Sequence, residues 1–140
     1  MTAARSSALA WTLGLLALAT GANAVWMLVG PGLWYRELPA AVPDFGPYNE
    51  HFVRDIGCAF AAFAVALGWA ARSPAVRFPL VSIAALFLVL HAGLHVFDTA
   101  RGYVAADHWW IDAPAVYLPA ALAALVTWKS RPGRPGGTPT

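Results

Sequence analysis

The sequence predicts an all-α integral membrane protein: a four-helix bundle that spans the membrane four times and has both termini in the cytoplasm. Three observations predict it: the composition, four long apolar segments, and the way the charges sort around them. Of the 140 residues, 59% are apolar and 11% are charged, whereas a soluble domain has about 45–50% apolar and about 25% charged residues. A chain this short cannot bury so much apolar surface in its own core. The composition therefore excludes a soluble enzyme and a disordered chain, and the lack of a basic face with interleaved aromatics argues against nucleic acid as a partner.

The four apolar segments set the expected helices. A helix needs about 20 mostly apolar residues to cross the hydrocarbon layer of a bilayer. We expect spans at about residues 8–30, 50–71, 78–97 and 113–128. Asn49 is placed to cap the second helix and Asp112 the fourth, because short polar side chains accept hydrogen bonds from the first backbone N–H groups of a helix. Residues 1–130 then form one domain, and the Pro- and Gly-rich residues 131–140 are predicted to be a disordered cytoplasmic tail.

The charges predict the orientation of the bundle. Six basic residues fall on one side of the four spans and three on the other, so the positive-inside rule puts both termini and the connection around residues 72–77 in the cytoplasm. The acidic residues were not used for this assignment and agree with it: all seven fall on the outer side, as do all four histidines. We therefore expect a multi-pass protein of the plasma (inner) membrane. The Ala-, Gly- and Arg-rich composition is compatible with a bacterial source.

The N-terminal segment allows a second interpretation. Arg5, the apolar run after it and Ala22-Asn23-Ala24 imitate a secretory signal peptide with its cleavage site. The apolar run continues beyond that site through Val29, where a mature secreted protein would become polar, so we expect the segment to stay as a membrane anchor. Cleavage after residue 24 would leave three spans and would not change which side holds the acids and histidines.

Two groups of polar residues are candidates for a functional site. His91, His95 and Asp98 are spaced by four and three residues near the outer end of the third span, so they share one stripe of the helix. His91 lies inside the apolar layer, where an ionisable residue is a functional candidate by default. At a similar depth, the second span begins with Glu50, His51, Arg54 and Asp55. These four can also serve structure alone, as helix-terminal charges and headgroup contacts.

The pattern supports two classes of function. In the first, His51, His91, His95 and Asp98 ligate a transition metal or haem, because imidazole and carboxylate groups are metal ligands; Glu50, Arg54 and Asp55 would support the site. In the second, the protein is an accessory subunit that meets a membrane-protein partner or a second copy of itself, and the cluster only fixes helix packing. A proton-coupled transporter is least favoured, because no carboxylate lies near the middle of a span. The sequence does not decide whether the chain is an enzyme.

The stretch Arg54-Asp55-Ile56-Gly57 at the entry to the second span, in a chain of four short spans, resembles the DoxX-like group of small bacterial membrane proteins. Some members of that group are associated with quinone-linked redox complexes. The resemblance implies the four-helix architecture and carries no catalytic residue onto this chain.

Overall fold

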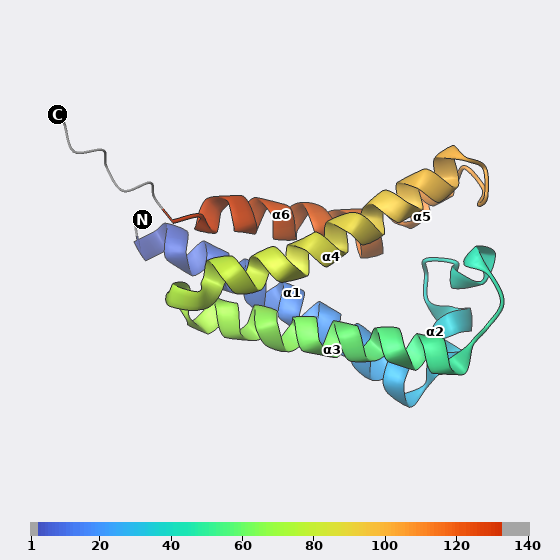
Figure 1. The fold of residues 1–140 in the computed structure, drawn as a ribbon, viewed down its shortest axis with the longest axis horizontal. Coiled ribbons are helices and arrows are strands. Elements are labelled where there is room, and N and C mark those ends of the chain that lie inside the picture. Colours follow the sequence, from blue (N-terminus) through green and yellow to red (C-terminus); the bar gives the residue numbers. More distant parts are fainter. Residues whose placement is uncertain (1–2, 133–140) are drawn as a thin grey trace.

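The computed structural model describes residues 3–132, and it is helical with no strand among them. The four predicted membrane-spanning helices are present (Figure 1), each long and apolar enough to cross a membrane. The elements run in the order α1 (Ala3–Val29), α2 (Pro31–Glu37), η1 (Val42–Phe45), α3 (Glu50–Arg72), α4 (Pro74–Ala100), α5 (His108–Ile111), η2 (Ala113–Tyr117) and α6 (Leu118–Ser130). The tail predicted to be disordered begins at Arg131, and its residues 133–140 lie outside the described part of the chain.

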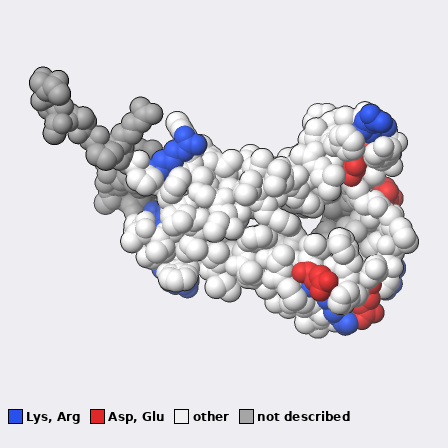
Figure 2. Space-filling view, in the orientation of Figure 1, with Lys and Arg blue, Asp and Glu red and all other residues white. Residues whose placement is uncertain are grey.

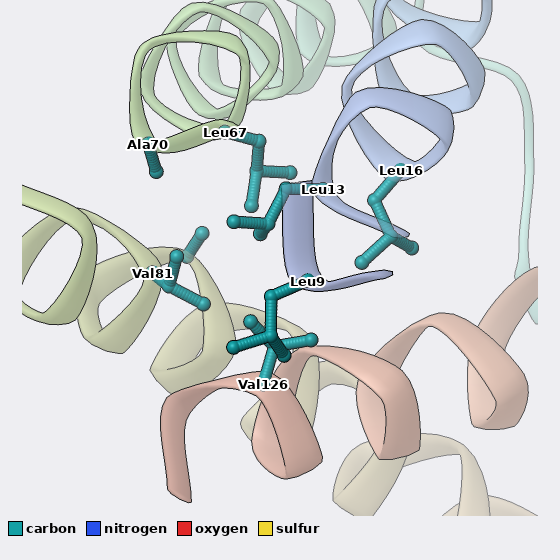
Figure 3. Packing of buried hydrophobic residues seen from close by; sticks show 8 residues of the cluster. Leu9, Leu13, Leu16, Leu67, Ala70, Val81 and Val126 are labelled. Carbon is teal, nitrogen blue, oxygen red and sulfur yellow. The ribbon is translucent and has the colours of Figure 1, made fainter. Parts of the chain in front are cut away.

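The helices form two antiparallel pairs. Figure 1 shows α1 beside α3 and α4 beside α6, with the pairs close together at one end and spread apart at the other. Where the pairs meet, side chains from all four helices form a buried apolar core (Figure 3). Its buried members are Leu9, Leu13, Leu16, Leu67, Ala70, Val81, Ala84 and Val126. The core therefore holds the two pairs together at one end of the bundle, and beyond it the pairs diverge.

The close approach of α1 and α3 depends on a glycine. A Cβ at Gly57 would lie 3.0 Å from the Cβ of Met27 and 3.2 Å from the Cγ of Leu28. The absence of a side chain at Gly57 lets the two helices pack against each other at this level, as small residues commonly do in membrane bundles.

The second and third spans lie next to each other in the chain. Asn49 caps α3 as predicted, since its side-chain oxygen accepts from the Phe52 backbone N–H at 3.1 Å. The expected loop around residues 72–77 is reduced to Ser73, because α4 already begins at Pro74. Arg77 is buried, and its guanidinium donates to the backbone oxygens of Ala70 and Ala71 at 3.0 and 3.3 Å. Arg77 thus satisfies carbonyl groups at the end of α3 that have no partner within the helix.

The fourth span differs from its prediction. It runs over His108–Ser130 and so begins five residues earlier than residue 113, with a π-helical turn, η2, between α5 and α6. The prediction that Asp112 caps this helix with its side chain was wrong. The helical path already continues through Asp112, whose backbone oxygen accepts from the N–H groups of Val116 and Tyr117. The carboxylate is left to make other contacts.

The surface matches a bilayer environment. Along the spans, large apolar side chains such as Leu15, Val65, Ile83 and Leu86 are exposed. Figure 2 shows a middle zone without charges and charged residues at the two ends. All seven carboxylates belong to the end where the helix pairs spread apart, called the acidic end below: Glu37, Asp44, Glu50, Asp55, Asp98, Asp107 and Asp112. These features fit a small multi-pass membrane protein.

Candidate functional site: a buried histidine–aspartate chain

Asp112 is the centre of a polar cluster inside the acidic end. Its carboxylate is 0% exposed and lies between two histidines. Oδ2 is 2.8 Å from Nδ1 of His95 on α4, and Oδ1 is 3.4 Å from Nδ1 of His108 on α5. A buried carboxylate is costly unless it is paired and hydrogen-bonded, and here each of its oxygens has an imidazole partner.

His108 connects this centre to the other helix pair. Its ring is also 0% exposed, and its Nε2 is 3.2 Å from Oδ2 of Asp44 in η1. Because η1 belongs to the connection between α1 and α3, this contact joins the two pairs at the acidic end. The ring of Phe45 adds to the junction, with its centroid 4.6 Å from that of His95 and 4.9 Å from that of His108.

The connection that carries Asp44 is held in place by its own contacts. The Tyr35 hydroxyl of α2 donates to the backbone oxygen of Gly46 at 2.7 Å. The Trp34 indole N–H donates to Oδ1 of Asn23 on α1, also at 2.7 Å. The turn before η1 puts Ala41 in the left-handed backbone region, with φ of 46°, which is uncommon for a residue with a side chain. Asp44 and Phe45 are thereby presented toward α4 and α5.

His91 continues the cluster toward the interior of the bundle. Its ring centroid is 4.6 Å from that of His95, one turn further along α4. On its other side the ring stacks on Phe87 at 5.9 Å between centroids, and Phe87 in turn contacts Phe60 and Phe63 of α3. His91 therefore lies on the side of α4 that faces α3. Figure 2 shows the surface hollowed where the two helix pairs separate, next to the acidic end.

The four histidines differ in their partners. His51, His95 and His108 each have a carboxylate within 3.4 Å. Within the described residues, His91 makes no hydrogen bond or ion pair, and its ring packs against the rings of Phe87 and His95.

The group at the start of α3 lies on the surface, apart from this cluster. The His51 side chain is 89% exposed, and its Nε2 is 3.3 Å from Oδ2 of Asp55 on the same helix. Arg54 pairs with Glu50 and donates to the backbone oxygen of Leu28 at 3.3 Å. These contacts match the structural interpretation of the segment, because exposed pairs four residues apart are ordinary features of a helix surface.

The structure does not assemble the predicted metal ligands. Among the described residues, no three or more His, Cys, Asp or Glu side chains are grouped closely enough to hold a metal ion. His91 and His95 are neighbours as the stripe predicts, but His51 lies on the outer surface of α3. Asp98 is partly buried and its carboxylate has no hydrogen bond or ion pair within residues 3–132.

Sequence reasoning missed most of the buried cluster. Asp112 was expected to be a helix cap, and the predicted spans left His108 and Asp44 in the connections between helices. One signal was present: His108 and Asp112 have the same four-residue spacing as His51 and Asp55. That spacing predicts a pair on one helix face, but only if the helix is known to begin at His108.

Comparison of the chain with protein-family models, with curated proteins and with solved structures gives no match. The class of molecule therefore rests on the fold and surface described above: an all-helical chain that fits a small multi-pass membrane protein, with a buried histidine–aspartate cluster at one end.

Proposed function

We propose that the protein is a small binding protein of the bacterial plasma membrane, with a ligand site in the hollow beside His91 and His95. The single observation that carries this proposal is the unpaired imidazole of His91. An ionisable side chain in an apolar layer is expensive to keep and normally faces a partner. His91 has none in residues 3–132, so a ligand that reaches its ring nitrogens supplies the missing hydrogen bond.

The surroundings of His91 favour one chemical class of ligand. The ring of Phe87 stacks on one side of His91, and the Phe60 and Phe63 rings lie behind it. Aromatic walls with a few placed polar groups are typical of small-molecule sites. His95 uses Nδ1 for Asp112 and keeps Nε2 for a second contact. We therefore propose a flat, lipid-soluble molecule that carries a hydroxyl or carbonyl oxygen.

A bicyclic phenol tests this site. Binding of 2-naphthol to the full chain in nanodiscs is measured by equilibrium titration and by the ¹⁵N shift of the His91 ring. We expect the ring signal to move in the wild type and affinity to fall at least about fivefold in His91→Leu, since a hydrogen bond to a buried imidazole contributes about 1 kcal/mol or more. The matched control is His51→Leu at the exposed histidine, which should bind like the wild type. Equal affinity in all three proteins contradicts the proposal.

The orientation of the bundle is part of the proposal. The excess of basic residues at the end opposite the acidic end supports cytoplasmic termini, and the acidic end with its cluster then lies outside. In a Cys58→Ser background, Asp107→Cys marks the acidic end and Arg131→Cys the other. A membrane-impermeant maleimide added to spheroplasts should label only the cysteine at position 107. Labelling of position 131 alone would reverse the orientation.

A second candidate function is that of an accessory subunit in which the cluster is structural, as is compatible with the DoxX-like resemblance. The contact that favours it is the one between Asp44 and His108, which joins the two helix pairs. On this hypothesis, His91→Leu lowers stability and changes the binding of no small molecule. The same titration, followed by thermal unfolding of the variant, separates the two functions.

A further inference from the structure

We propose that His95, Asp112, His108 and Asp44 form a proton path that connects the hollow beside His91 with water at the acidic end. This chain of four side chains is called the relay below. The proposal rests on the binding site proposed above, because that site is what the path would serve. Chains of Asp, Glu and His side chains are a common form of proton relay within membrane proteins.

The first argument is that the relay is continuous. The successive nitrogen–oxygen distances from His95 to Asp44 are 2.8, 3.4 and 3.2 Å. Each link joins an imidazole nitrogen to a carboxylate oxygen, and each inner member uses two different atoms for its two neighbours. Both ring nitrogens of His108 and both oxygens of Asp112 are occupied in this way. A proton can therefore enter at one atom of a group and leave at another.

The second argument is the change in exposure along the relay. Asp112 and His108 are 0% exposed, so water does not reach the middle of the path. The His95 side chain is 12% exposed at the inner end, and the Asp44 side chain is 53% exposed at the outer end. A purely structural contact does not require that its outermost member reach solvent. Asp44 reaches solvent while its carboxylate also contacts His108.

Aromatic and polar side chains of α4 and η1 surround the relay. His91 lies beside His95 on α4, Phe45 of η1 covers the rings of His95 and His108, and the Thr99 hydroxyl donates to the backbone oxygen of His95 at 2.9 Å. Within the described residues, no arginine or lysine bonds to any relay member. Among the described residues, the two relay carboxylates therefore pair only with imidazoles.

The proton balance of one transfer is simple. A proton from a ligand or from His91 arrives at Nε2 of His95, and the Nδ1 proton of His95 passes to Asp112. His108 takes a proton from Asp112 and gives one from Nε2 to Asp44, which releases a proton to water. One proton enters and one leaves. The Asp112 carboxylic acid receives its proton on Oδ2 and turns to give it from Oδ1, and rotation of the two imidazole rings then restores the starting arrangement.

The test measures proton exchange in the full chain without any ligand. In nanodiscs with ¹⁵N-labelled histidine, exchange between water and the His95 ring N–H is followed by magnetisation transfer. We expect Asp44→Asn to slow this exchange at least about tenfold, because an amide cannot take up and release the proton. His108→Gln breaks the middle of the relay and should have the same effect. Asp98→Asn is the matched control, since it removes a partly buried carboxylate outside the relay.

Either of two results overturns the proposal. Exchange in Asp44→Asn as fast as in Asp98→Asn shows that protons reach His95 by another route. Faster exchange shows that Asp44 closes the site instead of conducting. If His108→Gln does not fold, the exchange rate in Asp44→Asn still tests the proposal. Asp44 is half exposed on a short turn, so we expect this variant to fold.

The proposed binding site and the path fail independently. Intact 2-naphthol binding together with unchanged exchange overturns the path alone. Absence of 2-naphthol binding in the wild type overturns the binding site and leaves the exchange measurement readable.

Discussion

The buried carboxylate of Asp112 offers the sharpest test of how the acidic end is held together. Asp112 and Asp55 each pair with a histidine four residues earlier on the same helical segment. They differ in burial, since the Asp112 side chain is 0% exposed and the Asp55 side chain 61%. Asp112 also has a second partner, His95 of α4, from another helix. Asp112→Asn and Asp55→Asn are therefore the same chemical change at two sites that differ mainly in environment.

The magnitude follows from the contacts. Asparagine keeps one acceptor oxygen, so Asp112→Asn loses at least one of two charged hydrogen bonds, each of which contributes about 1.5–3 kcal/mol. The histidine left without a partner stays buried and adds its own desolvation cost. We expect the free energy of unfolding to fall by about 2–4 kcal/mol. For Asp55→Asn we expect about 0.3–0.5 kcal/mol, the value for an exposed pair at this spacing.

The assay is reversible unfolding of the full chain by SDS in mixed micelles, followed by circular dichroism. At about 1.4 kcal/mol per factor of ten in the equilibrium constant, the two variants should differ by at least tenfold. An Asp112→Asn protein as stable as Asp55→Asn would refute the reasoning, because it would mean that the buried carboxylate contributes no more than a surface one.

Three further predictions concern packing, helix termini and metal. Gly57→Ala should lower the free energy of unfolding by about 1–3 kcal/mol in the same assay, because its Cβ would meet α1 side chains at 3.0 Å. Gly14→Ala has nothing within 4 Å of the new methyl group and should be neutral or stabilising. Equal losses in both variants would contradict the close approach of α1 and α3. Arg77→Gln should lower the free energy of unfolding by about 2 kcal/mol, because it removes guanidinium donors from the end of α3. Arg72→Gln at an exposed site should change the free energy of unfolding by no more than about 0.5 kcal/mol. Similar values for the two variants would refute the capping role of Arg77. Tag-free folded protein analysed for zinc, copper and iron should contain well under one metal ion per chain, because no three His, Cys, Asp or Glu side chains among the described residues are grouped closely enough to hold an ion; near-stoichiometric metal that disappears in His91→Ala would contradict this expectation and support the metal hypothesis.

Features that depend on nearby residues were predictable from the sequence. Four apolar segments predicted the four spans, because a bilayer imposes length and composition on each helix separately. Asn49 was predicted as a helix cap, since a cap acts on backbone groups three residues away. His91 and His95 were predicted to share a face of their helix, as they do, because helical periodicity alone decides that.

Features that depend on residues distant in the chain were not predictable from the sequence. Asp112 was taken for a cap because nothing in its neighbourhood shows that α5 already provides the start of the helix. The partners of the buried cluster are separated by 17 residues for His95 and Asp112 and by 64 for His108 and Asp44. Local patterns carry no information about such pairs, so Asp44 and His108 drew no attention as a pair.

The sequence by itself determined that this chain has the composition of a membrane protein, which four segments form its spans, and that its acids and histidines gather at one end. Only the tertiary structure decided which of them meet. The connection between α1 and α3 brings the Asp44 carboxylate within 3.2 Å of the His108 ring on α5, which belongs to the other helix pair. The physical reason is that hydropathy and helical period act along one helix, whereas the burial of Asp112 between His95 and His108 depends on how several helical segments pack together.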